Sequence, residues 1–145
     1  MSDRLEPKVR LCFNTFYSLE TRWADNDIYG HVNNVAYYEY FDSVVNRFLI
    51  EKGGLDPAKD PVVGYVVNSS ASYFSSISYP QKVDVGLRIN RMGRKSITWG
   101  LGVFCPTESL CRVTGSFTHA FVARATGASV EIPPRIREAV EKLSA

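Results

Sequence analysis

The residues best suited to chemistry lie close together, in the segment from 25 to 34 that reads Asp-Asn-Asp-Ile-Tyr-Gly-His-Val-Asn-Asn. Asp25 and Asp27 supply carboxylates, which can act as general bases or nucleophiles, and His31 supplies an imidazole that exchanges a proton near neutral pH. The asparagines at 33 and 34 fall where a helix pattern begins. The first N–H groups of a helix have no partner within the helix and can stabilise a developing negative charge. This segment is therefore a candidate active site.

The same residues also have structural interpretations, which the residues alone leave open. Asp25 and Asp27 are ordinary turn residues that can accept hydrogen bonds from nearby backbone groups, and His31 can orient Asp27, position water or hold the turn together. Gly30 allows the backbone to turn sharply into the helix. Three candidate ligands on one loop, with no distant partner, do not predict a metal site.

The elements that flank this segment are a strand and a long helix. Apolar and polar residues alternate over 16–23, which predicts a strand. Over 36–52 the apolar spacing changes to three and four residues, and this pattern predicts an amphipathic helix that starts at an N-cap on Asn33 or Asn34 and stops at Gly-Gly 53–54. Its stripe is unusually apolar and aromatic, so we expect a buried helix, with the residues Tyr37, Tyr40, Phe41, Val44, Val45, Phe48 and Leu49 in the core.

The rest of the chain is mostly strand-like. Strands are predicted over 62–77, 83–89, 96–104 and 111–125, and a short helix over 134–143 that begins at a proline. Strands gathered on both sides of one helix, without regular alternation, indicate an α+β domain with an antiparallel sheet that covers the helix.

Small polar residues crowd the first of these later strands, over 68–72 and 75–76. Such residues in a strand can mark the close approach of a ligand or a second subunit. A solvent-exposed strand face gives the same pattern, and both interpretations stay open here.

Length and charge limit the class of protein. A chain of 145 residues is about one domain long and buries roughly 70% of its unfolded surface. Its formal charge of +2 is too small to indicate a nucleic-acid partner. We therefore expect a single domain over residues 1–145, with poor order over 1–10 and no nucleic-acid partner.

The cysteines and the apolar runs indicate where the protein works. Cys12, Cys105 and Cys111 are odd in number and form no Cys-x-x-Cys, so neither a disulfide framework nor a zinc site is predicted. No signal peptide and no apolar run of membrane-spanning length is present in the sequence. We expect a cytoplasmic protein with reduced thiols and no membrane partner.

The chain resembles a known family. The segment from Asp25 to Asn34, followed by Tyr37 and then Tyr40-Phe41, resembles the acyl-CoA thioesterases of the hot-dog superfamily, in the 4-hydroxybenzoyl-CoA thioesterase branch with its long-chain relatives. The resemblance covers nearly the whole chain. It implies a curved antiparallel sheet of about five strands wrapped around one long helix, with a short C-terminal helix. It also implies a cofactor-free thioester hydrolase that forms a homodimer or homotetramer with active sites at subunit interfaces.

The resemblance assigns roles by position. Asp27 falls on the catalytic aspartate, and the backbone N–H of Asn34 falls on the group that polarises the thioester carbonyl. Gly30 and His31 become supporting residues of the same loop. The basic turn, comprising Arg91, Arg94 and Lys95, matches the stretch that contacts the CoA phosphates, although a solvated hairpin tip would have the same composition.

The acyl group is less well indicated. Within the aromatic stripe of the long helix, Tyr37 and Phe41 are candidates for lining an acyl channel beside a neighbouring subunit. The helix residues from 37 to 41 differ from those of the 4-hydroxybenzoyl enzyme, so its aromatic substrate does not transfer, and the Gly-His-Val-Asn-Asn form is more similar to the fatty acyl branch.

Two other functions compete on the same fold. A dehydratase of hydroxyacyl thioesters would pair an aspartate with a histidine, but Asp27 and His31 lack the spacing typical of such enzymes. A non-catalytic acyl-thioester-binding protein would need only the fold and the cleft. Release of CoA from acyl-CoAs indicates the thioesterase, hydration of an enoyl-CoA indicates the dehydratase, and tight acyl-CoA binding without turnover indicates the binding protein.

Overall fold

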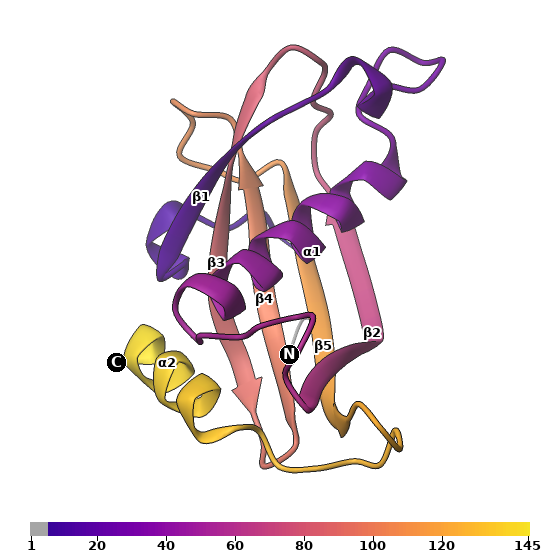
Figure 1. Ribbon diagram of the computed structural model, residues 1–145. Coiled ribbons are helices and arrows are strands. Elements are labelled where there is room, and N and C mark those ends of the chain that lie inside the picture. The colour runs from indigo at the N-terminus through magenta and orange to yellow at the C-terminus, as the bar shows by residue number, and fades with distance from the viewer. Residues whose placement is uncertain (1–5) are drawn as a thin grey trace.

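A computed structural model describes residues 6–145 as one five-stranded sheet with a long helix on one face (Figure 1). In chain order the elements are a 3-10 turn at Arg10–Cys12, β1 at Thr15–Glu20, a 3-10 turn at Trp23–Asp25, α1 at Asn34–Glu51, β2 at Val62–Tyr73, β3 at Lys82–Met92, β4 at Ser96–Phe104, β5 at Val113–Ala123 and α2 at Pro134–Ser144. Neither helix in this described part is long and apolar enough to cross a membrane.

The strand order in space is β1-β3-β4-β5-β2, and every neighbouring pair is antiparallel. β1 and β2 are therefore the two edges of the sheet. The α+β hot-dog prediction is confirmed, including five strands, one long helix and a short C-terminal helix. The order follows no simple meander, because β2 follows α1 in sequence but pairs with β5 (Figure 1).

The long helix begins and ends where its capping residues require. Asn33, and not Asn34, is the N-cap, and its side-chain oxygen accepts a 2.9 Å hydrogen bond from the N–H of Val35. At the other end the N–H groups of Lys52 and Gly53 both donate to the carbonyl of Phe48. Gly54 then takes a φ of 68°, which ends the helix.

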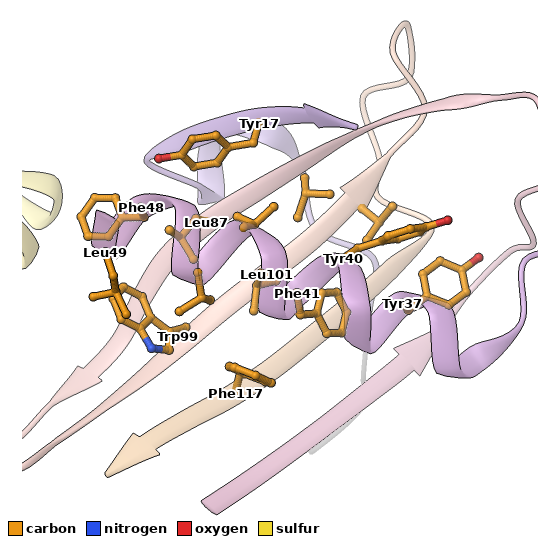
Figure 2. Packing of buried hydrophobic residues seen from close by; sticks show 14 of the residues in the cluster. Tyr17, Tyr37, Tyr40, Phe41, Phe48, Leu49, Leu87, Trp99, Leu101 and Phe117 are labelled. Carbon is orange, nitrogen blue, oxygen red and sulfur yellow. The ribbon is translucent and has the colours of Figure 1, made fainter. Parts of the chain in front are cut away.

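The aromatic stripe of α1 lies against the concave face of the sheet (Figure 2). Phe41 and Trp99 have no exposed surface, and the ring of Phe48 lies 5.8 Å from that of Trp99. Phe41 packs directly on the backbone of β5, where a Cβ added to Gly115 would come within 2.4 Å of its ring. Each buried side chain of this size contributes about 1.5 to 3 kcal/mol, so this layer is the main source of stability.

The bounds of β1, β2, β3 and β5 differ from those predicted, and β3 extends three residues beyond its predicted end, to Met92. β1 ends at Glu20, and Trp23 lies in a 3-10 turn with 76% of its surface exposed, because the Asp25 carboxylate accepts a hydrogen bond from the N–H of Arg22 and closes a turn there. β2 ends at Tyr73, because the next two N–H groups both donate to the carbonyl of Arg112. β5 is shorter than predicted by two residues at each end.

The segment before β1 crosses the outer face of the sheet, opposite α1. Val9 bridges to Leu110, and the ring of Phe13 lies over Gly86 and Gly102, where added Cβ atoms would come within 2.7 and 2.5 Å of it. The structure describes residues 6–10, for which the expectation of poor order over 1–10 stays a prediction. For residues 1–5 that expectation lies outside the described part of the chain.

Candidate active site

Asp25 anchors the start of the 25–34 loop to Arg22 and to Tyr40 of α1. Its side chain is 1% exposed and accepts four hydrogen bonds, from the Arg22 N–H at 2.8 Å, from the Arg22 guanidinium at 3.0 and 2.8 Å, and from the Tyr40 hydroxyl at 2.8 Å. Burial works to raise the pKa of Asp25, but the hydrogen bonds from Arg22 and Tyr40 outweigh it and hold that pKa below its ordinary value. With both oxygens engaged, Asp25 is a structural carboxylate.

Asp27 has a different environment in the same loop. It is only partly buried, and its Oδ1 accepts one 2.9 Å hydrogen bond, from the N–H of Tyr29. Its backbone closes a turn, because its N–H donates to the carbonyl of His31 and its carbonyl accepts from Gly30. No residue between 6 and 145 donates to its Oδ2. That oxygen remains available to a water molecule or a carbonyl carbon.

The turn depends on Gly30, and the side chain of His31 is exposed beside it. Gly30 has a φ of 81°, in the left-handed region that favours glycine. The His31 side chain is exposed, and its ring forms no hydrogen bond within the described part of the chain. His31 therefore contributes its backbone carbonyl to the turn, and its ring does not hold the Asp27 carboxylate.

A distant segment, residues 77–79, clamps the loop in place. The N–H of Val32 donates to the carbonyl of Ile77 at 2.7 Å, and the hydroxyl of Ser78 donates to the carbonyl of Gly30 at 2.9 Å. The N–H of Tyr79 donates to the side chain of Asn26 at 3.1 Å. Sequence reasoning missed these contacts, because partners some fifty residues apart leave no local pattern.

Asn34 is the first residue of α1 and is exposed. Its N–H has no acceptor among residues 6–145, because an N–H in the first turn of a helix has no carbonyl partner within the helix. A cleft of about 300 Å³ opens beside it, lined by Val32, Asn34, Tyr37, Tyr73, Phe74, Ser75 and Ser76. The partial positive charge of the helix start therefore lies beside a space that can hold a small group.

Of the two residues predicted to line an acyl channel, only Tyr37 lines this cleft. Tyr37 forms a wall of the cleft, 5.5 Å from the ring of Tyr73, and burial raises its pKa to about 12, so its hydroxyl is uncharged. Phe41 is fully buried against Gly115 and has no surface to offer an acyl group in the single chain. Asp27 is not among the residues lining this cleft.

The basic turn lies far from the loop within one chain. Arg91, Arg94 and Lys95 surround the turn between β3 and β4, whereas the 25–34 loop lies beside the segment leading into β3 (Figure 1). The eleven residues of β3 separate the two by about 33 Å. All three side chains are exposed, and Arg94 pairs with Glu131 at 3.0 Å.

His119 is a core residue on β5. It is 2% exposed, and the indole N–H of Trp99 donates to its Nδ1 at 3.2 Å. Burial lowers its pKa to about 4, so the ring is neutral at physiological pH. It has no part in the loop chemistry.

The fold and loop are shared with known proteins. Residues 21–140 match the family model of the thioesterase-like superfamily. The PA5185 protein of Pseudomonas aeruginosa strain PAO1 is 42% identical, with a TM-score of 0.94 over 97% of this chain and 98% of that one. Among curated proteins, none matches this chain.

Two solved structures share the fold at lower identity. A DHNA-CoA thioesterase from Staphylococcus aureus is 23% identical, with a TM-score of 0.79 over 89% of each chain. A 1,4-dihydroxy-2-naphthoyl-CoA thioesterase from Synechocystis is 14% identical, with a TM-score of 0.80 over 88% of this chain and 96% of that one. Because the family model spans the 25–34 loop, α1, all strands but β1 and most of α2, this chain belongs to the thioesterase-like superfamily and is a thioester hydrolase with the hot-dog fold.

Proposed function

We propose that this protein hydrolyses acyl-CoA thioesters to the free acid and CoA, with Asp27 as the catalytic carboxylate. The observation that carries the proposal is the N–H of Asn34, which starts an 18-residue helix, has no acceptor among residues 6–145 and belongs to a residue that lines the cleft. The resemblance of the loop to the acyl-CoA thioesterases supplies the substrate class.

The chemistry suits these groups. A thiolate leaves easily, because thiols ionise at about pH 8 to 9, so the reaction has little need of a dedicated general acid. Asp27 can activate water as a general base or attack the carbonyl and form a mixed anhydride that water then cleaves. The N–H of Asn34 stabilises the oxyanion in both routes, and one such donor typically contributes about 3 to 4 kcal/mol. No cofactor is required.

A second subunit completes the site in this proposal. β2 is an edge strand, and its large apolar side chains are exposed in the single chain, with Tyr65, Val66 and Val67 at 51%, 46% and 62%. Open edges and exposed apolar patches of this kind favour pairing with another chain. We expect two copies to pair along β2, as a homodimer or as half of a homotetramer.

Such pairing would also explain the position of the basic turn. If β2 pairs with β2 of a second copy in antiparallel fashion, the two sheets run in opposite directions. The turn with Arg91, Arg94 and Lys95 from one copy then lies at the same end of the joint sheet as the 25–34 loop of the other. These side chains can hold CoA phosphates there, since arginine forks phosphate and lysine acts as a point charge.

Two alternative functions have less support from the described residues. A dehydratase would need an aspartate paired with a histidine, and the ring of His31 makes no hydrogen bond to Asp27. A protein that only binds acyl thioesters has no use for a free carboxylate oxygen on Asp27.

Cys12, Cys105 and Cys111 are all free thiols, which agrees with a cytoplasmic location.

The test is release of free thiol from a panel of acyl-CoAs of increasing chain length and from aromatic acyl-CoAs. We expect turnover by the wild type, and a loss of about 10²- to 10⁴-fold in kcat for Asp27→Ala and Asp27→Asn. Asp42→Asn, which changes an exposed carboxylate on α1, is the matched control and keeps full activity. No thiol release from any substrate, or full activity in Asp27→Ala, would contradict the proposal.

A further inference from the structure

A second cavity lies at the far end of α1 from the candidate active site. It has a volume of about 500 Å³ and lies between α1, α2 and β1, with the lining residues Thr15, Tyr17, Phe48, Lys52, Arg135, Glu138, Ala139, Lys142 and Leu143. This volume is in the range of about 300 to 1,000 Å³ that small-molecule sites occupy. From Asn34 to Lys52 the helix rises about 27 Å, so the two sites do not overlap.

The floor of this cavity is apolar. Figure 2 shows Tyr17 and Phe48 together at one end of α1, with Tyr37 and Tyr40 at the other. Tyr17 is 9% exposed and Phe48 2% exposed, so only a small part of each ring reaches the cavity, and the partly buried Ala139 and Leu143 of α2 supply the rest of the floor. A hydrocarbon chain laid on this floor would exclude water from apolar surface, at about 25 cal/mol per Å².

The rim of the cavity is cationic. The lining has a formal charge of +2, from three cations and one carboxylate: Lys52, Arg135, Lys142 and Glu138. Arg135 is paired with Asp60, and Lys142 lies 3.6 Å from Glu138 with both side chains exposed. Exposed pairs of this kind are weak and easily exchanged.

Lys52 is the cation best placed for a new partner. It makes no ion pair with any residue from 6 to 145. It is also exposed, one residue beyond the end of α1, and Phe48, whose ring forms part of the floor, lies four residues before it. A charged head at Lys52 would therefore have apolar surface directly beneath its tail.

The geometry points to a binding site for an anionic amphiphile, namely the carboxylate of a fatty acid, with the head at Lys52 and the chain over Tyr17, Phe48 and Leu143. The choice of a fatty acid rests on the proposed function, because a fatty acyl-CoA thioesterase releases such an acid. The site itself rests only on the shape and charge of the cavity.

Binding of dodecanoate, kept below its micelle concentration, tests this inference. The ring of Trp99 lies 5.8 Å from that of Phe48, so its fluorescence reports on the cavity floor, and Trp23→Phe removes the other tryptophan signal. We expect saturable binding with one site per chain by fluorescence and by calorimetry. Lys52→Met should weaken it about 10-fold through loss of a charge-assisted contact. Lys59→Met, at an exposed lysine outside the cavity, is the control.

Two further probes locate the site and keep the test decisive. Ala139→Phe fills the cavity and should abolish binding, with a thermal melt to show that the variant is folded. The double variant Lys52→Met with Lys142→Met changes only exposed side chains and gives an independent loss. Dodecan-1-ol, which has the chain without the charge, should bind at least 10-fold more weakly.

Unchanged affinity in Ala139→Phe and in the double variant would place dodecanoate elsewhere and overturn the inference. Equal affinity for dodecanoate and dodecan-1-ol would overturn the role of the cations. Because none of these measurements needs turnover, failure of this site is distinguishable from failure of the proposed hydrolysis, which the thiol assay alone decides.

Discussion

The hydroxyl of Tyr40 lies 2.8 Å from Oδ2 of Asp25 and donates a buried hydrogen bond that joins α1 to the loop preceding it. Burial raises the pKa of Tyr40 well above its ordinary value, and the bond to Asp25 raises it further. The hydroxyl therefore keeps its proton and its role as donor over the whole physiological pH range. Through this contact the helix core holds the loop that carries Asp27.

Removing the Tyr40 hydroxyl should loosen that connection. We expect Tyr40→Phe to lower the free energy of unfolding by about 1 to 3 kcal/mol, because Oδ2 of the buried Asp25 carboxylate loses one of its two donors. Urea unfolding measures the change. Tyr65→Phe, which removes the hydroxyl from a half-exposed ring on β2, is the control. Equal stability of Tyr40→Phe and wild type would show that the contact contributes little.

The oxyanion role of Asn34 predicts opposite results for two substitutions at one position. Asn34→Ala keeps the backbone N–H and should keep kcat within a few-fold, whereas Asn34→Pro removes that N–H and should lower kcat by about 10²- to 10³-fold. Proline is well tolerated at the first position of a helix, and Asn33 already has the extended ψ of 144° that a following proline requires. Circular dichroism should show an intact helix in both variants. A fully active Asn34→Pro would remove this group from the mechanism.

The buried ring of His119 predicts a loss of stability in mild acid. Its pKa is lowered to about 4 in the folded protein, so between about pH 6.5 and 4 the unfolded chain takes up a proton that the folded chain does not. Stability is therefore unaffected above pH 6.5, falls by about 3 kcal/mol as the pH drops to 4, and loses no more from this group below that. Urea unfolding at several pH values, compared with His119→Gln, isolates the effect. Parallel pH profiles for the two proteins would contradict it.

The close packing of Phe41 on β5 predicts intolerance at Gly115. A Cβ there would come within 2.4 Å of a fully buried ring, so Gly115→Ala should cost about 1 to 3 kcal/mol through forced displacement of Phe41. Gly93→Ala is the matched control, because its Cβ would meet nothing closer than 3.5 Å. Thermal melting of the two variants gives the comparison, and equal melting temperatures would show that the core yields at no cost.

Features with a local cause could be predicted from the sequence. β4 begins and ends at the predicted residues, because its alternation is regular and a turn bounds it on each side. The stripe of α1 and its N-cap follow from spacing and from the chemistry of asparagine in the same way. The predicted strand over 16–23 wrongly includes Trp23, because the alternation of apolar and polar residues continues into a turn that the Asp25 carboxylate imposes.

Features that depend on topology could not be predicted. Nothing near Ser78 in the sequence indicates that its hydroxyl meets the carbonyl of Gly30. The separation of the basic turn at Arg94 from Asp27 likewise follows from the strand order, which a single sequence does not encode in any local pattern. The roles of Asp25 and Asp27 were open for the same reason, since only the folded chain supplies Tyr40 as the donor that distinguishes them.

The ring of Phe13, seated over Gly86 and Gly102, also restricts how copies of this protein can stack. With Phe16 and Phe104 it covers the outer face of the sheet near β1 and β3, while over β4 and β5 that face includes short side chains such as Thr98 and Thr118, whose hydroxyls lie 3.0 Å apart. A flat surface approaching the sheet from outside therefore meets a raised aromatic ridge near β1 and β3. Any assembly built back to back on this face has to accommodate that ridge.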